Sequence, residues 1–192
     1  ERYADADSQR SFYRSLGDRL AAIPGVESVG FGVSAPSDFV QRLEYEIGDS
    51  PADASRPTVG RFVAGAGYFR TLGIRLIAGR GFDDSDSTSS PPVAIVNAQF
   101  ASAHWPAESP IGKRLRLFDN GRGSPWITVV GLVGNVVQNA RSRQAFEPLV
   151  YLPYAQSTQR NMHAFARTRV APETLAGAFR RVVYELDPGL PV

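Results

Sequence analysis

Cysteine is absent from this sequence of 192 residues. Its absence excludes a disulfide scaffold, a thiolate metal site and catalysis by a cysteine nucleophile. Histidine is scarce too, because only His104 and His163 are present and neither has a carboxylate nearby at ligand spacing. We therefore expect no metal site and no histidine-based catalytic triad.

Long hydrophobic runs are also missing. A helix that crosses a bilayer needs about 20 consecutive apolar residues. The longest candidate, WITVVGLVGNVV at 126–137, is too short, so we expect no membrane span within these residues. The chain begins at Glu1 without an initiator methionine and ends in LDPGLPV. From this we expect it to be a piece of a longer protein.

A strong excess of one charge sign is missing as well. There are 21 Lys and Arg residues against 19 Asp and Glu, which leaves a net charge of +2. Nucleic-acid-binding proteins usually concentrate basic residues on one face, whereas here they are spread along the chain. We expect no nucleic-acid partner. With 43% hydrophobic and 21% charged residues, the composition is typical of a folded globular protein.

Amphipathic helices are predicted near both ends of the chain. Leu16 and Leu20 belong to an apolar stripe in SFYRSLGDRLAAIPG, which Pro24-Gly25 should end. The strongest stripe in the chain lies at 175–186 and includes Phe179 and Val183. Two shorter helices are expected at 66–73, ending at Gly73, and after Asn97, whose side chain should cap the helix.

Strands are predicted to outnumber helices. Alternating or short apolar runs favour strands at 26–33, 43–47, 58–65, 74–79, 93–96, 148–154 and 163–170, and Asn120-Gly121 is typical of a hairpin turn within 113–134. The predicted fold class is α+β. We expect one lobe formed by both termini, residues 1–80 and 156–192, with a mostly-β lobe inserted at 81–155.

Three short motifs suggest chemistry but lack what that chemistry needs. GFGVSA at 30–35 matches a dinucleotide fingerprint, yet Pro36 interrupts the helix that should hold the pyrophosphate; close backbone approach at strand glycines is the alternative. Ser34 lies in GVSAP, which lacks the second glycine of a nucleophile elbow. DDSD at 83–86 lacks the glycine and distal glutamate of a calcium loop, so we expect a solvated loop. The sequence therefore predicts no catalytic residue and no cofactor.

One segment is a candidate for contact with another protein. RSRQAF at 141–146 combines arginines with an aromatic residue, types that are enriched at protein interfaces. The candidate contact residues are Arg141, Arg143 and Phe146. A surface turn before the strand at 148–154 is the alternative.

The order of the motifs carries a family resemblance. GYFRTLGIRLIAGRGF, PPVAIVNAQFASAHWP, SPIGKRLRL, WITVVGLVGNV and PLVYLPYAQ follow one another, with LAAIPGVESVGFGVSAP before them and VYELDPGLPV at the end. This succession resembles the MacB-like periplasmic core domain of MacB/FtsX-type ABC transporter permeases over nearly the whole chain. Two positions depart from the family pattern: Ala98 stands where an acid is frequent, and Asn135 replaces a frequent aspartate.

The resemblance implies a fold and a role. It implies a porter-like lobe with an inserted sabre-like lobe, in an extracytoplasmic domain between two transmembrane helices of a permease in the inner membrane. The domain would not be an enzyme, and would couple ATP hydrolysis by a cytoplasmic ATPase to conformational change for export, efflux or mechanotransmission. A periplasmic adaptor or a lipoprotein is a further implied partner.

Other expectations follow from this role. GYFRTLGIRLIAGRGF at 67–82 becomes scaffold, with Tyr68, Phe69, Leu72, Ile74 and Leu76 in the core and Gly73, Gly79 and Gly81 in turns. The first and last helices should lie side by side, with Leu16, Leu20, Phe179 and Val183 packed against one strand layer.

Two alternatives remain open from the sequence. One is a ligand-binding or sensory module anchored by flanking membrane helices, whose pocket 34–58 would line with Arg42 and Tyr45. The other is an enzyme of unrecognised type, which would show perturbed ionisable groups gathered in a cleft.

Overall fold

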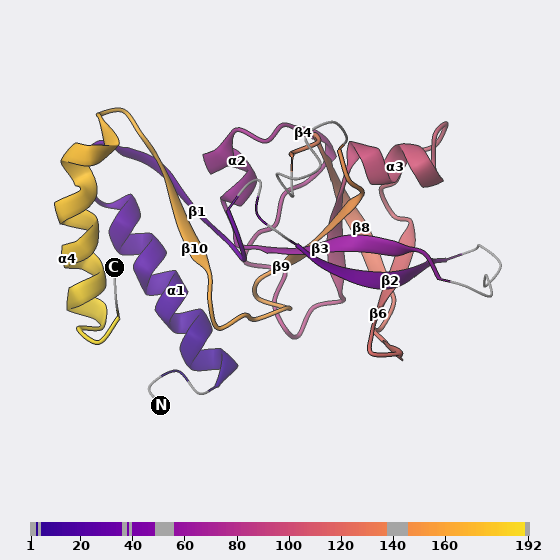
Figure 1. The fold of residues 1–192 in the computed structure, drawn as a ribbon, viewed down its shortest axis with the longest axis horizontal. Helices are drawn as coiled ribbons and strands as arrows, with labels where there is room; N and C mark the ends of the chain where they lie inside the picture. Colours follow the sequence, from indigo (N-terminus) through magenta and orange to yellow (C-terminus); the bar gives the residue numbers. More distant parts are fainter. Residues whose placement is uncertain are drawn as a thin grey trace.

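The structure is a computed structural model that describes residues 3, 5–35, 38, 40–48, 56–137 and 146–190. Helices and strands alternate irregularly along the chain, which confirms the α+β class (Figure 1). In chain order the elements are α1 Ala6–Ala21, β1 Val26–Gly32, β2 Gln41–Ile47, β3 Thr58–Ala64, α2 Tyr68–Leu72, β4 Leu76–Gly79, β5 Val93–Asn97, α3 Ala98–His104, β6 Arg114–Asp119, β7 Arg122–Gly123, β8 Ile127–Val133, β9 Leu149–Pro153, β10 His163–Thr168, a 3₁₀ turn Pro172–Leu175, and α4 Ala176–Leu186.

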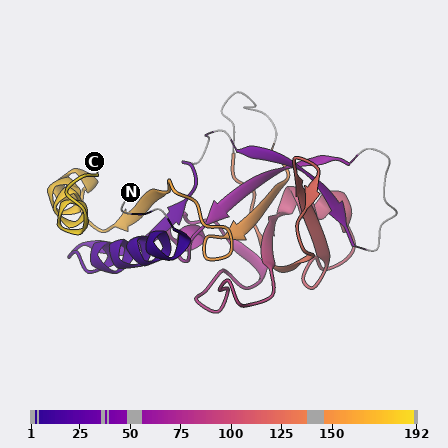
Figure 2. The ribbon, with the colours of Figure 1, turned by 90° about the horizontal axis from the view of Figure 1, so that it is seen from below.

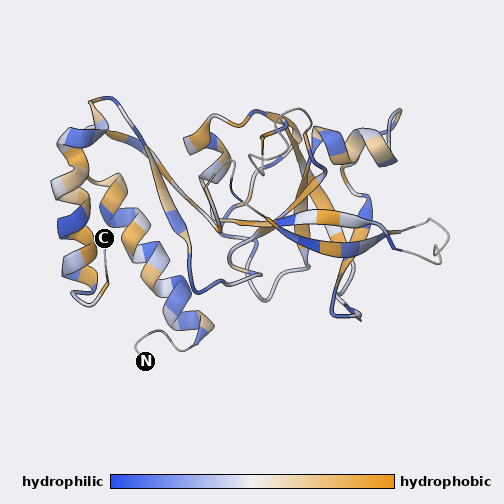
Figure 3. Ribbon diagram, viewed as in Figure 1, coloured by the Kyte–Doolittle hydropathy of each residue, from blue (hydrophilic) through white to orange (hydrophobic). Residues whose placement is uncertain are grey.

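Most of the strands form a closed ring. The hydrogen-bonded order is β3-β2-β6-β8-β5-β9, and β9 then pairs in parallel with β3 to close it. One core cluster includes Tyr45, Leu115 and Val150, with Phe100 of α3 and Trp105, which follows that helix, packed into it. A second cluster lies on the opposite faces of β5 and β9 and is covered by Tyr68 and Phe69 of α2. Hydrophobic and hydrophilic residues alternate along β2 and β3, and α1 and α4 carry bands of both kinds (Figure 3).

The helical end of the molecule is built on a two-stranded ribbon. β1 pairs with β10 in antiparallel fashion, and α1 and α4 lie side by side next to this ribbon (Figures 1 and 2). Leu16 and Leu20 of α1 are buried, as predicted. α4 contains no buried residue, so Phe179 and Val183 are only half-buried. The helices next to both ends of the chain therefore lie together, and α4 packs more loosely than its stripe predicted.

The ribbon joins the ring through very few pairs. The registered pair between β1 and β3 is Gly32 with Ala64. Backbone hydrogen bonds from Val33 N to Val63 O, at 3.0 Å, and from Gly65 N to Phe31 O, at 2.8 Å, complete the junction. The two predicted lobes thus share one sheet, because β2 and β3 pair with β6 and β9. The division at 81–155 stays a prediction.

Local signals placed several boundaries correctly. Asn97 caps α3 by accepting a hydrogen bond from Phe100 N at 3.0 Å. Asn120 and Gly121 have φ of 49° and 77° in the turn after β6, and Gly73 has φ of 70° at the end of α2. The first helix begins earlier than predicted, at Ala6, because Asp5 accepts a hydrogen bond from Ser8 N and caps it.

Candidate interaction site

The two histidines do not form a catalytic group. The His104 ring lies against Phe100 and Trp105, and its Nε2 is 2.7 Å from the hydroxyl of Tyr45. Burial lowers the pKa of His104, which favours the neutral ring that accepts a hydrogen bond from tyrosine. His163 is exposed and stacks on Phe165. His104 therefore packs, as its place at a helix end predicted.

Ser34 and the nearby glycines serve packing. Within the described residues the buried hydroxyl of Ser34 has no hydrogen-bond partner, so no base activates it. A Cβ at Gly30 would lie 2.7 Å from Cα of Tyr68, and one at Gly32 would lie 2.6 Å from Cε2 of that ring. These glycines let α2 approach β1 closely, which is the alternative that the sequence left open for GFGVSA.

The acidic loop at 83–86 corrects an expectation. Asp86 is only 2% exposed, and both its oxygens accept hydrogen bonds from Arg80, at 2.7 and 2.8 Å. It is therefore not part of a solvated loop, because an arginine that precedes it in the chain draws the carboxylate inward. Across the described ranges, no three His, Cys, Asp or Glu side chains are grouped so that they could hold a metal ion.

Arg42 and Tyr45 form contacts within the fold. The Tyr45 side chain is buried and its hydroxyl is engaged by His104. Arg42 donates hydrogen bonds to Glu147 Oε2 at 3.0 Å and to Thr58 O at 3.1 Å. Both side chains are therefore committed to contacts within the fold, and neither lines the two grooves described next.

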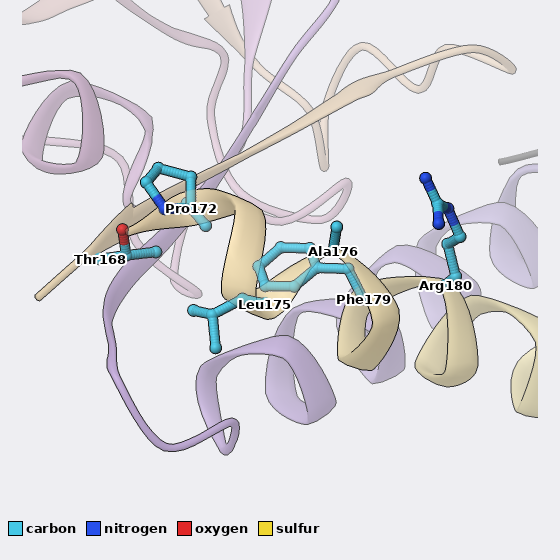
Figure 4. Close-up of a pocket in the computed structure, with 7 residues that line it drawn as sticks. Thr168, Pro172, Leu175, Ala176, Phe179 and Arg180 are labelled. Atoms are coloured by element: carbon cyan, nitrogen blue, oxygen red, sulfur yellow. The ribbon is translucent and has the colours of Figure 1, made fainter. Parts of the chain in front are cut away.

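A shallow apolar groove lies between β10 and α4 (Figure 4). Its volume is about 380 Å³, and it is lined by Ala166, Thr168, Pro172, Leu175, Ala176, Phe179 and Arg180. Leu175 and Phe179 lie together beneath Pro172, whereas Arg180 points away from them (Figure 4). The groove exists because the residues of β10 beneath α4 are small. It offers apolar contact but few converging polar groups, unlike a typical small-molecule site.

A second groove adjoins the start of β4. It measures about 450 Å³ and is lined by Leu72, Gly73, Ile74, Arg75, Gly134, Asn135 and Val136. Leu76 and Ile77, which follow in β4, are 44% and 47% exposed. The expectation that Leu76 belongs to the core is therefore wrong: β4 pairs with β8, but the Leu76 side chain lies on the surface. Tyr68 and Phe69 are buried as expected.

Arginines and aromatic rings stack on the outer side of β6. Arg116 lies 5.1 Å from the ring of Phe118 and 4.9 Å from that of Trp126, and Arg56 lies over the Phe118 ring at 3.8 Å. Glu46 accepts hydrogen bonds from both arginines, and these bonds hold the pKa of its carboxyl below the usual range. Glu46 thus offsets part of the positive charge of the stack and holds the two arginines in place.

Of the three residues predicted to contact another protein, the structure describes Phe146. Arg141 and Arg143 lie outside the described residues. Phe146 is 45% exposed, so its ring is available on the surface. Asn135, one of the two departures from the family pattern, accepts a hydrogen bond from Gln99 N at 2.8 Å and so helps to cap α3. The contact through Arg141, Arg143 and Phe146 stays a prediction.

Solved structures resemble this fold. The periplasmic region of MacB from Actinobacillus actinomycetemcomitans matches with a TM-score of 0.62 and 17% identity, over 90% of this chain and 73% of that one. The extracellular domain of the noncanonic ABC-type transporter YknZ from Gram-positive bacteria matches with a TM-score of 0.58 and 15% identity, over 90% and 81%. No curated protein matches the chain.

The family assignment comes from the sequence profile rather than from these distant structures. The family model of the MacB-like periplasmic core domain matches residues 2–185 of this chain. No helix in the described ranges is long and apolar enough to cross a membrane. Because the match covers nearly the whole chain, the chain belongs to the MacB-like periplasmic core domain family and is a periplasmic domain of an ABC-type transporter permease.

Proposed function

We propose that this domain is a non-catalytic mechanical coupler in an inner-membrane permease. Two flanking transmembrane helices would hold it in the periplasm, and a cytoplasmic ATPase subunit or domain would move those helices. The domain would convert that motion into a displacement of its β-rich ring, as one body, relative to the helical end, for export, efflux or mechanotransmission. A periplasmic adaptor or a lipoprotein is the further partner that we propose for it.

The observation that carries this proposal is the pairing of α1 with α4. These helices come from opposite ends of the chain, yet they pack against each other, and Arg19 of α1 lies 3.5 Å from Glu185 of α4. Two membrane spans attached to such neighbouring helices would act on one small body. α1 contacts β1 directly, with Gly17 facing the ring of Phe31, so its displacement would be passed to the ribbon.

The junction between ribbon and ring is suited to act as a hinge. A hinge is a short segment that absorbs a change in backbone angles while the bodies on either side stay packed. Here the ribbon meets β3 through Gly32 and Ala64, next to Gly65 and Gly67. Gly67 has φ of 80°, a conformation that other residues rarely adopt. By contrast, each strand of the closed ring is paired on both sides, so its strands cannot separate easily along an edge.

Distance measurements between spin labels in the full permease test the proposal. The chain has no native cysteine, so Arg14→Cys in α1 and Arg122→Cys in β7 label the two bodies specifically once other cysteines of the permease are removed. We expect ATP to shift the distance distribution of this pair. The pair Ser102→Cys in α3, which packs on the ring, and Arg122→Cys in β7, which pairs with β6 of the ring, should keep one distribution. A coupling role is excluded if ATP binding and turnover leave the first distribution unchanged in a permease with a working ATPase.

A further inference from the structure

One edge of β4 pairs with no other strand in the part of the chain that the structure describes. β4 pairs with β8 through Leu76–Val133 and Gly79–Gly131, and no strand of the described ranges pairs with its other edge. Most of its residues, including Leu76 and Ile77, are exposed. Natural proteins usually protect such an edge, because unpaired backbone groups beside apolar side chains attract another strand. An uncovered edge of this kind is a candidate for strand addition by a partner.

Two arginines in the segment that leads into β4 have no acidic partner within the described ranges. The sequence contains no Asp or Glu from 56 to 82, whereas Arg70, Arg75 and Arg80 all lie in this stretch. Arg80 is neutralised by Asp86. Arg70 and Arg75 are exposed, and neither forms an ion pair with any residue in the described ranges. Two cations therefore remain free to bind a carboxylate.

A third arginine extends this charge towards β10. Arg167 donates a hydrogen bond from Nε to Thr71 O at 3.1 Å, and its guanidinium lies beside Gly73. The groove at the start of β4 begins at this point, with Leu72, Ile74 and Val136 as its apolar lining. The groove, the two arginines Arg75 and Arg167 beside it, and the start of β4 thus lie next to one another.

We propose that the β4 edge binds an extended protein segment in which acidic and apolar residues alternate. The backbone of that segment would pair with β4, its carboxylates would pair with Arg70 and Arg75, and its apolar side chains, which all lie on the opposite face of the added strand, would cover Leu76. A second copy of this chain fits less well, because pairing two β4 edges would bring like-charged arginines together. This inference does not depend on the coupling role.

Titration of the isotope-labelled chain with a short peptide of alternating glutamate and valine, followed by NMR, tests the proposal. We expect shifts of the amide signals from Arg75 to Gly79. A matched peptide of lysine and valine should cause none. Binding should weaken with salt, since the screening length falls from ~10 Å at 0.1 M to ~3 Å at 1 M.

Substitutions of arginine by glutamate identify the arginines that bind the acidic peptide. Arg75→Glu replaces an attraction by a repulsion and should weaken binding by about tenfold. Arg70→Glu serves as a second variant in case the first disturbs β4. Arg122→Glu reverses an equally exposed arginine on β7 and should leave the affinity unchanged.

Three outcomes would overturn the proposal. The first is no shift in β4 at about 1 mM peptide, a concentration that detects even binding worth about 4 kcal/mol. The second is equal binding of the lysine peptide. The third is concentration-dependent self-association through β4 in the absence of peptide, which would assign the edge to a second copy of the chain.

Discussion

Asp86 and Arg80 form a two-point ion pair at the end of β4. The carboxylate oxygens of Asp86 accept hydrogen bonds from Nη1 and Nη2 of Arg80, and a third bond comes from Asp83 N at 3.0 Å. The carboxylate is buried, whereas the Arg80 side chain is 42% exposed. The pair therefore fixes the loop after β4 while one partner stays in contact with solvent.

We predict that Asp86→Ala destabilises the domain. The variant removes three hydrogen bonds to a buried carboxylate, but Arg80 can still be solvated, so the loss should be about 2 kcal/mol rather than that of a fully buried pair. Urea denaturation of the purified chain measures it. Asp84→Ala, an exposed neighbour in the same acidic run, should change the free energy of unfolding by less than about 0.5 kcal/mol. Equal effects of both substitutions would mean that the loop does not depend on this pair.

The contact between Tyr45 and His104 predicts a dependence of stability on pH. Burial lowers the pKa of His104 in the folded state, whereas an unfolded histidine titrates near pH 6.5. Between these two pKa values the unfolded chain binds more protons, so stability rises with pH there. The contribution of His104 is complete above about pH 6.5 and is lost as the pH falls towards the folded-state pKa.

Carboxylates also make stability depend on pH, so the contribution of His104 is measured by comparing the wild-type chain with histidine variants. We expect the wild-type chain to lose more stability than His104→Gln between about pH 7.5 and pH 5.5 in urea denaturation. His163→Gln is the matched control, because His163 is exposed on β10 and should leave the wild-type pH dependence intact. A His104→Gln chain with an unchanged pH dependence would contradict the prediction.

Features fixed by neighbouring residues were predictable from the sequence. Asn97, Gly73 and the turn at Asn120-Gly121 behave as predicted, since a cap or a positive φ depends on a few adjacent residues. Closure of the ring was not predictable. It rests on parallel pairing of β3 with β9, for example Gly60 with Leu149, and no local pattern specifies such a distant partner.

At the candidate site, too, the sequence predicted local features but not the contacts between distant parts of the chain. The exposed arginines of the 67–82 segment were visible in the sequence, but the alternation of Ile74, Leu76 and Ala78 placed Leu76 in the core. Alternation predicts which residues share a face and cannot tell whether another layer covers that face. In the same way, DDSD does not reveal which of its carboxylates turns inward. Asp86 does so because Arg80 lies within reach.

We predict opposite effects on stability for two substitutions of glycine by alanine, one at the close contact between β1 and α2 and one in α4. A Cβ at Gly30 would lie 2.7 Å from Cα and 2.9 Å from N of Tyr68, both of which are backbone atoms that cannot rotate away. Gly30→Ala should therefore destabilise the domain by about 2–3 kcal/mol. A Cβ at Gly177 in α4 would meet no atom of the described residues within 4 Å. Gly177→Ala should stabilise by about 0.5 kcal/mol, because alanine favours helix and restricts the unfolded chain.

Thermal and urea unfolding of the two variants measure these effects side by side. The methyl group added by Gly30→Ala should also push α2 away from the ribbon, next to the proposed hinge. The amide signals of Tyr68 and Phe69 should therefore shift strongly. Gly177→Ala should leave those signals in place. If Gly30→Ala were as stable as the wild-type chain, there would have to be room for a Cβ between Gly30 and the backbone of Tyr68. The close packing of α2 on β1 would then not hold the junction at Gly32.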